Sequence, residues 1–287
     1  MNAPNPLPTD PLSAQFASDA HLRVRQRIYA QYQFPRVDFP LWVLARHVWR
    51  GDEHLLDVGS GNGAYYTRIQ EHLPDARYTA LDRYTGVLAL NPCSARVQAD
   101  AAALPFATAA FDVVLANEML HFIADPEAAI ADMARVLKPG GVLIAAAQSL
   151  YDMPQIFALV REVLSALMPP NTRNTPFQPP HMAFGLENGT RLLARTFPGV
   201  VRYELPTSLI FDAPGPVLDF IASWRSHFEP QFPSGIGWDD ALERMRSVVA
   251  HRIRQRGEFG VELISGALVA TVSGGFLREF AAKKIRL

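Results

Sequence analysis

Cysteine is almost absent from this 287-residue sequence, which contains Cys93 alone. A single thiol cannot close an intrachain disulfide or build a cysteine-rich zinc site, so no metal site is expected. Cys93 is interpreted as a small buried hydrophobic residue in a reducing compartment. A chain of this length can bury roughly three quarters of its unfolded surface and form a full core without cross-links.

An excess of charge of either sign is also missing. The formal net charge is -1 and the sequence pI is about 6.7. The longest run of basic residues is Lys283-Lys284. Because binding to a polyanion requires a basic surface that neutralises phosphates, we do not expect nucleic acid as a partner.

Long apolar runs are missing as well. The sequence has no 18 uninterrupted apolar residues, and residues 1–15 have neither the basic start nor the apolar centre of a secretory signal. We therefore expect no membrane partner and a cytoplasmic location. Residues 1–18 contain four prolines among small and polar residues. This composition predicts a disordered tail.

A glycine loop is the first positive signal. Residues 55–63 read LLDVGSGNG, an apolar strand followed by Gly59, Gly61 and Gly63. Glycine removes the Cβ atoms that would keep a ligand away from the backbone where a helix begins. The same residues, with Ala64, also satisfy the dinucleotide fingerprint, so the loop alone leaves a nicotinamide dinucleotide open.

Three acidic residues narrow the choice of ligand. The strand predicted at 77–81 is followed by Asp82, and the strand at 95–99 by Asp100. Asp82 is placed for a ribose diol and Asp100 for an adenine amino group. Asp57, directly before the glycines, would crowd a pyrophosphate. The pattern therefore favours an adenosyl ligand that carries an ammonium and a sulfonium.

Strands and helices alternate through the first half of the chain. Strands are predicted near 53–58, 77–82, 95–99, 111–116 and 141–148, and helices near 63–72, 85–90 and 127–137. Alternation predicts an α/β fold with a parallel sheet covered on both faces. Two earlier helices, at 19–33 and 41–48, predict an N-terminal helical cap over residues 19–50.

The alternation breaks after Gln148. Residues 150–183 are predicted to be an insertion with an amphipathic helix near 156–168, and residues 214–255 a second, aromatic insertion. Strands at 199–211 and 261–272 are predicted to complete the sheet. We therefore expect a single domain over residues 19–287, with a cofactor-binding core at 51–149 and both insertions on the substrate side.

Five sequence blocks, in order, carry a family resemblance. They are DVGSGNG at 57–63, ALD at 80–82, ADAAALPF at 99–106, FDVVLANEMLHFIADP at 111–126 and RVLKPGG at 135–141. The chain resembles the class I S-adenosylmethionine-dependent methyltransferases, in particular the small-molecule group (methyltransferase domain 11-like) that includes the ubiquinone and menaquinone C-methyltransferases. The resemblance implies a Rossmann-like seven-stranded sheet of order 3-2-1-4-5-7-6 with strand 7 antiparallel. It also implies S-adenosyl-L-methionine as cofactor and S-adenosyl-L-homocysteine as product.

Candidate site residues fall into three groups. The cofactor-binding candidates are Asp57, Gly59, Ser60, Gly61, Asn62, Gly63, Asp82, Arg83, Asp100, Ala101 and Asn117. The candidate general base is His121, because it follows the fourth strand and imidazole titrates near neutral pH. The substrate-side candidates are Tyr29, Tyr32, Gln33, Glu118, His181 and Trp224. Glu118 is interpreted as an exposed acid at a helix start.

The expected function is methyl transfer to a small-molecule acceptor by in-line displacement at the sulfonium. Alignment and exclusion of water supply much of the rate, and a base is needed only where the nucleophile must lose a proton. One alternative is an rRNA or tRNA base methyltransferase, although Asn117-Glu118-Met119-Leu120 replaces the Asn-Pro-Pro-aromatic signature. Another is a non-catalytic protein that binds an S-adenosyl ligand. The acceptor atom stays open, as does the choice between a monomer and a homodimer.

Overall fold

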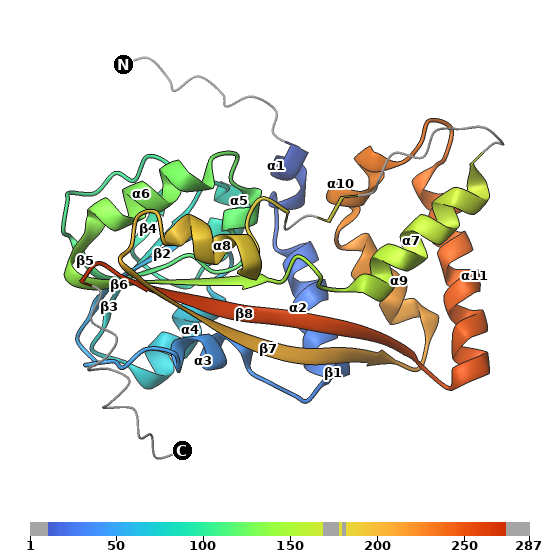
Figure 1. Ribbon diagram of the computed structural model, residues 1–287, viewed down its shortest axis with the longest axis horizontal. Coiled ribbons are helices and arrows are strands. Elements are labelled where there is room, and N and C mark those ends of the chain that lie inside the picture. Colours follow the sequence, from blue (N-terminus) through green and yellow to red (C-terminus); the bar gives the residue numbers. More distant parts are fainter. Residues whose placement is uncertain (1–10, 169–177, 180–181, 274–287) are drawn as a thin grey trace.

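The computed structural model describes residues 11–168, 178–179 and 182–273, which form two lobes joined by a long β-ribbon (Figure 1). The lobe that we call the core holds β2 (His54–Val58), α4 (Ala64–His72), β3 (Arg77–Asp82), α5 (Thr85–Leu88), β4 (Arg96–Gln98), β5 (Phe111–Leu115), α6 (Pro126–Val136) and β6 (Leu137–Gln148). Strands and helices alternate in the core as the sequence predicts.

One sheet runs through the molecule in the order β1-β7-β8-β6-β5-β2-β3-β4. Strands β2 to β6 are parallel to their neighbours, whereas β8 (Phe259–Thr271) is antiparallel to both β6 and β7 (Gly199–Phe211). Counted from β2, this is the predicted order 3-2-1-4-5-7-6, which is confirmed. The eighth strand is the short β1 (Gln33–Phe34), which pairs antiparallel with β7.

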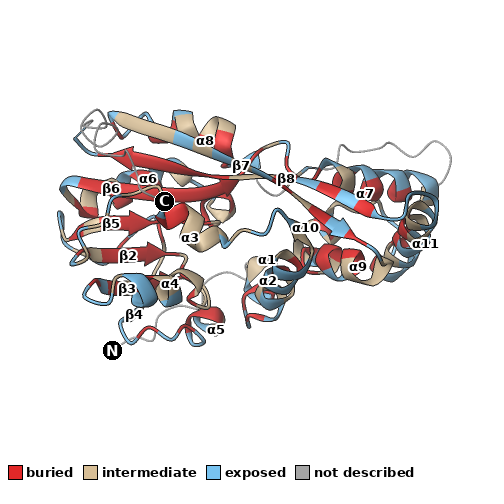
Figure 2. Ribbon diagram, turned by 90° about the horizontal axis from the view of Figure 1, so that it is seen from below, coloured by how far each residue is buried: buried red, intermediate tan, exposed pale blue. Residues whose placement is uncertain are grey.

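The central residues of β2, β3, β5 and β6 are apolar and buried because helices cover both faces of the sheet. Leu55, Leu56 and Val58 of β2 are fully buried, and Figure 2 shows the same burial across β2, β5 and β6. At the start of α6, the Asp125 side chain accepts a hydrogen bond from the Ala128 N–H at 3.0 Å, with Pro126 at the first position. Such a cap fixes where the chain turns back towards β6.

The last two strands reach far beyond the core. All of β7 pairs with β8, but β6 pairs with β8 only through residues 265–271. Residues 206–211 and 259–264 therefore form a ribbon past the carboxyl end of β6, and β1 pairs with the outer edge of this ribbon at Ser208 and Leu209. The ribbon supports the second lobe, which we call the cap: α7 (Pro154–Leu167), α9 (Pro214–Ala222), α10 (Arg225–Phe228), the 3₁₀ turn η3 (Glu229–Gln231) and α11 (Trp238–Arg256) (Figure 1).

The cap has its own apolar cluster. Phe211 of the ribbon and Phe220 of α9 are fully buried in it, together with apolar residues of α7 and α11. The helices of the two substrate-side insertions thus pack against each other, although residues 169–177 and 180–181 of the first insertion lie outside the described residues. The remaining helix, α8 (Leu186–Leu193), packs against β7 and β8 in the core.

The predicted N-terminal cap is divided between the two lobes. Helix α2 (Ala20–Tyr32) packs on α9 and β7, and its Ile28 is buried in the cap cluster. Helix α3 (Phe39–Leu44) instead packs on α4, and its Val43 is buried in the core. Helix α2 therefore lies at the boundary between core and cap.

The prediction of a disordered tail is wrong for residues 11–18. They contain helix α1 (Pro11–Gln15) and Phe16, whose side chain is buried. The Phe16 ring stacks on Tyr84 at 5.0 Å between centroids and meets Phe122 edge-on at 5.5 Å. One aromatic residue with distant partners orders a segment whose average composition is that of a disordered chain. Residues 1–10 lie outside the described part of the chain.

No helix in the described ranges combines the length and the apolar character that crossing a membrane requires.

Candidate active site

The glycine loop folds against the end of β3. The N–H groups of Gly59 and Ser60 donate to the carbonyl of Leu81 at 2.8 and 3.0 Å. The N–H of Gly61 donates to Asp82 Oδ2 at 2.9 Å. These bonds bring the first and second sequence motifs together at the carboxyl edge of the parallel sheet, which is the edge where open α/β sheets bind ligands.

Two glycines of the loop are required for different reasons. Gly59 has a φ of +72°, and a Cβ atom there would lie 2.7 Å from Met119 Cβ, far inside normal contact. Gly61 has a φ of +52°, but its Cβ would meet Leu22 Cδ1 at an ordinary 3.6 Å. Gly59 thus permits the loop to touch the chain that follows β5, and Gly61 leaves space between the loop and α2.

The acids next to the loop are buried. Asp82 Oδ1 accepts a hydrogen bond from the Tyr84 N–H at 2.9 Å, and burial raises the pKa of Asp82 despite the backbone donors. Burial also raises the pKa of Asp57 to about 7, although its hydrogen bond from the Tyr78 hydroxyl opposes that shift. The sequence predicts that Asp57 binds the ligand. In the structure its Oδ2 atom instead accepts a hydrogen bond from the Tyr78 hydroxyl inside the core.

The other cofactor-side candidates surround the same loop. Ser60 Oγ accepts a hydrogen bond from Asn91 at 3.2 Å, and Gly63 is the N-cap residue of α4. The Asn62 side chain bonds Asp19 and Gln26, both at 3.4 Å, and so connects the loop to the N-terminal segment.

Three further candidates, Arg83, Asp100 and Ala101, follow β3 and β4. Arg83 and Asp100 form a partly exposed ion pair at 3.5 Å. Ala101, which follows Asp100 in the chain, is buried. Asp100 Oδ1 also accepts from the Ala102 N–H at 2.9 Å. Asp100 therefore stands at the end of β4, where the sequence places it, with its carboxylate shared between a side chain and the backbone.

Asn117 supplies an unused donor beside the loop. Its Oδ1 accepts from the Ala146 N–H at 3.0 Å, whereas its buried Nδ2 has no partner among the described residues. A buried donor without a partner costs about 1–3 kcal/mol, so such groups commonly await a ligand. The glycine loop, the fixed acid Asp82 and this amide together fit an adenosyl ligand.

His121 lies in η1 (Leu120–Phe122), directly after β5. Its side chain is buried, and its ring centroid is 4.0 Å from that of Phe122, which in turn contacts Phe16. The structure thus places His121 in the layer between the core and the N-terminal segment, on the same edge as the glycine loop.

The interpretation of Glu118 as an exposed helix-start acid is wrong. Its Oε1 atom is buried and has no hydrogen-bond partner in the described structure, and its Oε2 accepts from Gln148 Nε2. Burial raises the pKa of Glu118 to about 7, against the opposing effects of Gln148 and Arg25. The residue also has a φ of +56°, which a non-glycine residue adopts only at some cost. Neighbours distant in sequence account for this burial.

The substrate-side candidates divide into two groups. Tyr32 lies 4.9 Å from Phe211 between ring centroids, and Gln33 Nε2 donates to Thr207 Oγ1 at 3.1 Å. Both therefore attach the N-terminal segment to β7. Tyr29 packs edge-on against Phe220 at 5.9 Å, and burial raises the pKa of its hydroxyl.

Trp224 lies deep in the same region. Only 5% of the residue is exposed, the Arg25 guanidinium lies 4.5 Å from its ring centroid, and its Nε1 donor is buried without a described partner. His181, the remaining candidate, lies outside the described residues.

Sequence reasoning missed three polar residues of this region. Arg25 and Asp152 are 8% and 1% exposed, respectively, and Gln148 is the partner of Glu118. Gln148 could have been found, since it is the last residue of a predicted strand at the carboxyl edge. Neither Arg25 on α2 nor Asp152 in the turn after β6 stands out in the sequence, because their burial depends on contacts between the lobes.

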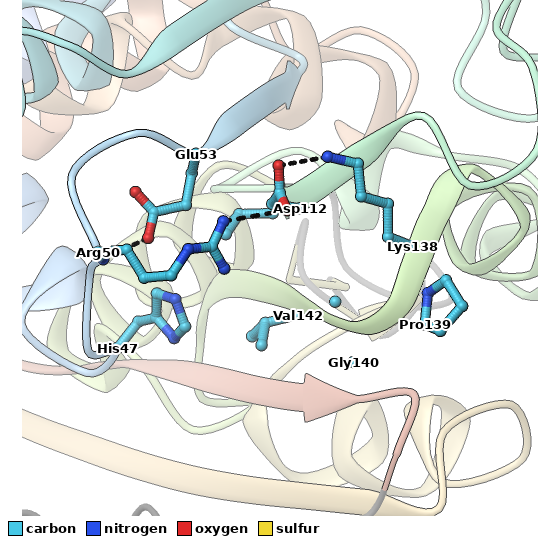
Figure 3. Close-up of a pocket in the computed structure, with 10 residues that line it drawn as sticks. His47, Arg50, Glu53, Asp112, Lys138, Pro139, Gly140 and Val142 are labelled. Atoms are coloured by element: carbon cyan, nitrogen blue, oxygen red, sulfur yellow. Dashed lines mark hydrogen bonds and ion pairs between the residues drawn. The ribbon is translucent and has the colours of Figure 1, made fainter.

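A separate pocket lies at the opposite edge of the sheet (Figure 3). Its charged residues are paired: Asp112 bonds Arg50 at 3.1 Å and Lys138 at 2.7 Å. Burial would raise the pKa of Asp112, but Lys138, the His54 N–H and Arg50 hold it at about 2. These ion pairs tie the starts of β2, β5 and β6 together, so we assign the pocket a structural role.

Comparisons with known proteins agree on one domain type. Residues 56–145 match the family described as "Methyltransferase domain". The chain is 33% identical over 112 residues to a malonyl-[acyl-carrier protein] O-methyltransferase of Hahella chejuensis. The match covers 36% of this chain and 40% of that protein. It is 32% identical over 142 residues to a trans-aconitate 2-methyltransferase of Acidovorax ebreus. This match covers 48% of this chain and 54% of that protein.

The likeness in three dimensions reaches further along the chain. A Haemonchus contortus phosphoethanolamine N-methyltransferase 2, solved with phosphomonomethylethanolamine and S-adenosylhomocysteine, has a TM-score of 0.55 at 16% identity. The match covers 92% of this chain and 59% of that one. By contrast, the sequence matches span about half or less of the two curated relatives. The family match at residues 56–145 lies within the core, and the helices of the cap lie outside that range.

Proposed function

We propose that the chain, whose residues 56–145 match the methyltransferase domain family, transfers a methyl group from S-adenosylmethionine to a small-molecule acceptor between the core and the cap. The observation that carries the proposal is the closure of the glycine loop on Asp82 at the carboxyl edge of the sheet. The cap stands over that same edge, on the ribbon of β7 and β8.

The cofactor supplies an electrophilic methyl group on its sulfonium. Asp82 is proposed to bind the ribose diol and Asp100 the adenine amino group, with Arg83 and Ala101 beside them. Asn117 offers its unpartnered amide to the polar end of the ligand. The glycine loop lets the ligand approach bare backbone, and the resulting alignment is the main catalytic device available to a displacement reaction.

The acceptor side is proposed to exclude water. The partly buried Tyr29 of α2 packs on Phe220 of α9, Trp224 is buried under Arg25, and Phe16 contacts Phe122 next to His121. A closed apolar layer of this kind prevents hydrolysis and strengthens every electrostatic interaction within it. His121 is the proposed base for an acceptor that must lose a proton.

Calorimetric titration with S-adenosylmethionine and, separately, with NAD tests the cofactor assignment. We expect binding of the first and none of the second. Asp82→Ala removes the proposed ribose contacts, each worth about 1.5–3 kcal/mol, so affinity should fall about tenfold or more. Asp100→Ala should weaken binding less, because a single adenine contact is lost.

The control for Asp82→Ala is Asp82→Asn, which retains one acceptor oxygen for the Gly61 or Tyr84 N–H. It should fold like the native protein and bind the cofactor with intermediate affinity. Unchanged affinity in a folded Asp82→Ala protein would contradict the assignment. Salt-sensitive binding of structured rRNA, tighter than that of any metabolite, would favour the base methyltransferase instead.

The role of His121 is tested by two substitutions. If His121 accepts a proton, both His121→Asn and His121→Phe should lower the rate of methyl transfer by roughly 10²- to 10⁴-fold with cofactor affinity retained. If His121→Phe remains active, then the His121 ring only shapes the wall of the acceptor site, and alignment of the reactants alone accounts for the rate.

A further inference from the structure

Several buried polar atoms between the two lobes have no partner within the described structure. They are Glu118 Oε1, Asp152 Oδ2, Tyr65 Oη and Trp224 Nε1. Each atom is almost inaccessible to solvent, and a buried polar group normally forms at least one hydrogen bond. The charge of Glu118 acts on both Tyr65 and Asp152, so these three groups lie near one another.

Glu118 and Asp152 are held at neighbouring points of the sheet. Glu118 is bonded to Gln148, which pairs with Ser265 at the point where β8 crosses the end of β6. Asp152 Oδ1 accepts a hydrogen bond of 2.6 Å from the N–H of Ile264, which directly precedes Ser265 in β8. Each carboxylate is therefore fixed by one oxygen and leaves its other oxygen unused.

The backbone is distorted at both acids. Glu118 has a φ of +56°, and Met153, directly after Asp152, has a φ of +51°. A non-glycine residue adopts a left-handed conformation only at a steric cost. Strain of this kind persists where surrounding contacts enforce it and is common in ligand-binding sites.

The charges of this region do not balance. Arg25 is the cation that acts on Glu118, while the charge that acts on Asp152 is that of Glu118 itself. Two carboxyl groups face one guanidinium, so the second carboxyl to ionise has no cation of its own. Burial accordingly raises the pKa of both acids.

We propose that Glu118 and Asp152 bind a positively charged amino group of the acceptor. An ammonium group supplies N–H donors to the two unused carboxylate oxygens. It also adds one positive charge to a site that has two acids and one base. The Trp224 indole and Tyr29 ring offer an apolar wall for the rest of the molecule. This inference names an acceptor class for the proposed function and rests on it.

A carboxylate acceptor fits the same region poorly. It would meet two acids and have Arg25 as its compensating cation, but that guanidinium already donates to the Ser223 carbonyl at 2.9 Å and lies over Trp224. Like charges in a buried site cost several kcal/mol. The chain should therefore differ in acceptor from relatives whose names specify malonyl or trans-aconitate substrates.

The experiment uses a panel of small aromatic and aliphatic skeletons, each as the amine, the alcohol and the carboxylic acid. 2-Phenylethylamine, 2-phenylethanol and 3-phenylpropanoate form one such set. Binding to the protein saturated with S-adenosylhomocysteine is measured by calorimetry and by thermal shift. We expect amines to bind at least tenfold more tightly than the alcohol and acid of the same skeleton.

Three variants locate that preference. Glu118→Gln and Asp152→Asn keep the oxygens that accept from Gln148 and Ile264, so both should fold, and each should weaken amine binding about tenfold or more. Glu162→Gln, on the exposed face of α7, removes a carboxylate paired with Arg252 and should leave amine affinity within about twofold. Affinity for S-adenosylhomocysteine should stay within about threefold in all three.

The outcomes separate the two proposals. Absence of S-adenosylmethionine binding to the native protein overturns the proposed function itself. Cofactor binding without amine selectivity anywhere in the panel, or a preference for carboxylates, overturns the amine site and leaves methyl transfer standing. Loss of cofactor affinity in Glu118→Gln equal to the loss of amine affinity would assign Glu118 to the cofactor instead. Because the panel is first measured on the native protein, a variant that fails to fold does not remove the test.

Discussion

The cofactor side and the acceptor side of this molecule treat their polar groups differently. Around the glycine loop, Asp82 accepts from two backbone N–H groups and the loop itself bonds the Leu81 carbonyl. Between core and cap, Glu118 and Asp152 each keep one buried oxygen without a described partner. Backbone donors thus satisfy Asp82, and Asn117 Nδ2 is an exception next to the loop, whereas Glu118 and Asp152 each leave an acceptor oxygen unused.

Packing, by contrast, is equally dense in both lobes. Phe220 in the cap and Phe111 in the core are 0% and 1% exposed, and each belongs to a large apolar cluster. The unsatisfied polar atoms therefore do not reflect a loosely packed cap. They mark the boundary where two well-packed units meet.

Equal packing predicts equal losses on truncation. Phe220→Ala and Phe111→Ala should each lower the free energy of unfolding by about 3–5 kcal/mol, measured by chemical denaturation. Phe34→Ala, which truncates a residue that is 67% exposed, serves as control and should cost less than about 0.5 kcal/mol. A cost below 1 kcal/mol for Phe220→Ala alone would mean that the cap is poorly packed and would break the comparison.

Substitution of glycines tests the claim that the cofactor side is built by close contact. Gly59→Ala adds a Cβ that overlaps Met119 and imposes a side chain at positive φ, so it should cost about 3 kcal/mol and weaken cofactor binding. Gly257 has a similar φ of +85° with nothing within 4 Å of its Cβ position. Gly257→Ala should therefore cost about 1–2 kcal/mol and spare the cofactor. If both variants lose the same stability in thermal unfolding, then the backbone conformation, and not the contact with Met119, determines the cost of Gly59→Ala.

The smallest effect concerns the pH dependence of stability. The pKa of Glu118 is about 7 in the folded protein against about 4.3 in an unfolded chain, so its favourable contribution is complete below about pH 4 and is lost as the pH rises to about 7. Glu118→Gln should therefore raise the melting temperature at pH 8 by a few degrees. Gln148 and Arg25 oppose the rise in the pKa of this carboxyl, and its charge in turn raises the pKa values of Tyr29, Tyr65 and Asp152.

The difference between native protein and variant should vanish near pH 4.5. A difference that stays constant with pH would mean that Glu118 is ionised throughout the range, and that its burial is relieved by water. Glu162→Gln, on the surface of the cap, controls for the loss of a charge as such.

The core could be predicted from sequence because its signals are local. The apolar run before Asp57, the acid at the end of each strand and the stop at Lys138-Pro139-Gly140-Gly141 all lie within single segments. The order of the strands came from the family resemblance, not from periodicity. These parts of the prediction agree with the structure.

The boundary between the lobes could not be predicted, because its residues are buried by partners far along the chain. Glu118 contacts Gln148 thirty positions later, and Arg25 donates to Ser223 across 198 positions. Phe16 lies in a proline-rich segment, but Tyr84 and Phe122 bury it. Composition and periodicity describe a residue's neighbours in sequence, and they carry no information about such contacts.

Helix α2 has a consequence for the order in which ligands bind. Its residues Gln26 and Leu22 face the glycine loop, through the bond to Asn62 and the contact next to Gly61, while Arg25 and Tyr29 line the acceptor side. A helix is stiff over four residues, so a ligand that settles in the loop also fixes the position of the acceptor-side groups. Kinetically, this arrangement favours a compulsory sequence in which the cofactor enters first and its spent form leaves last.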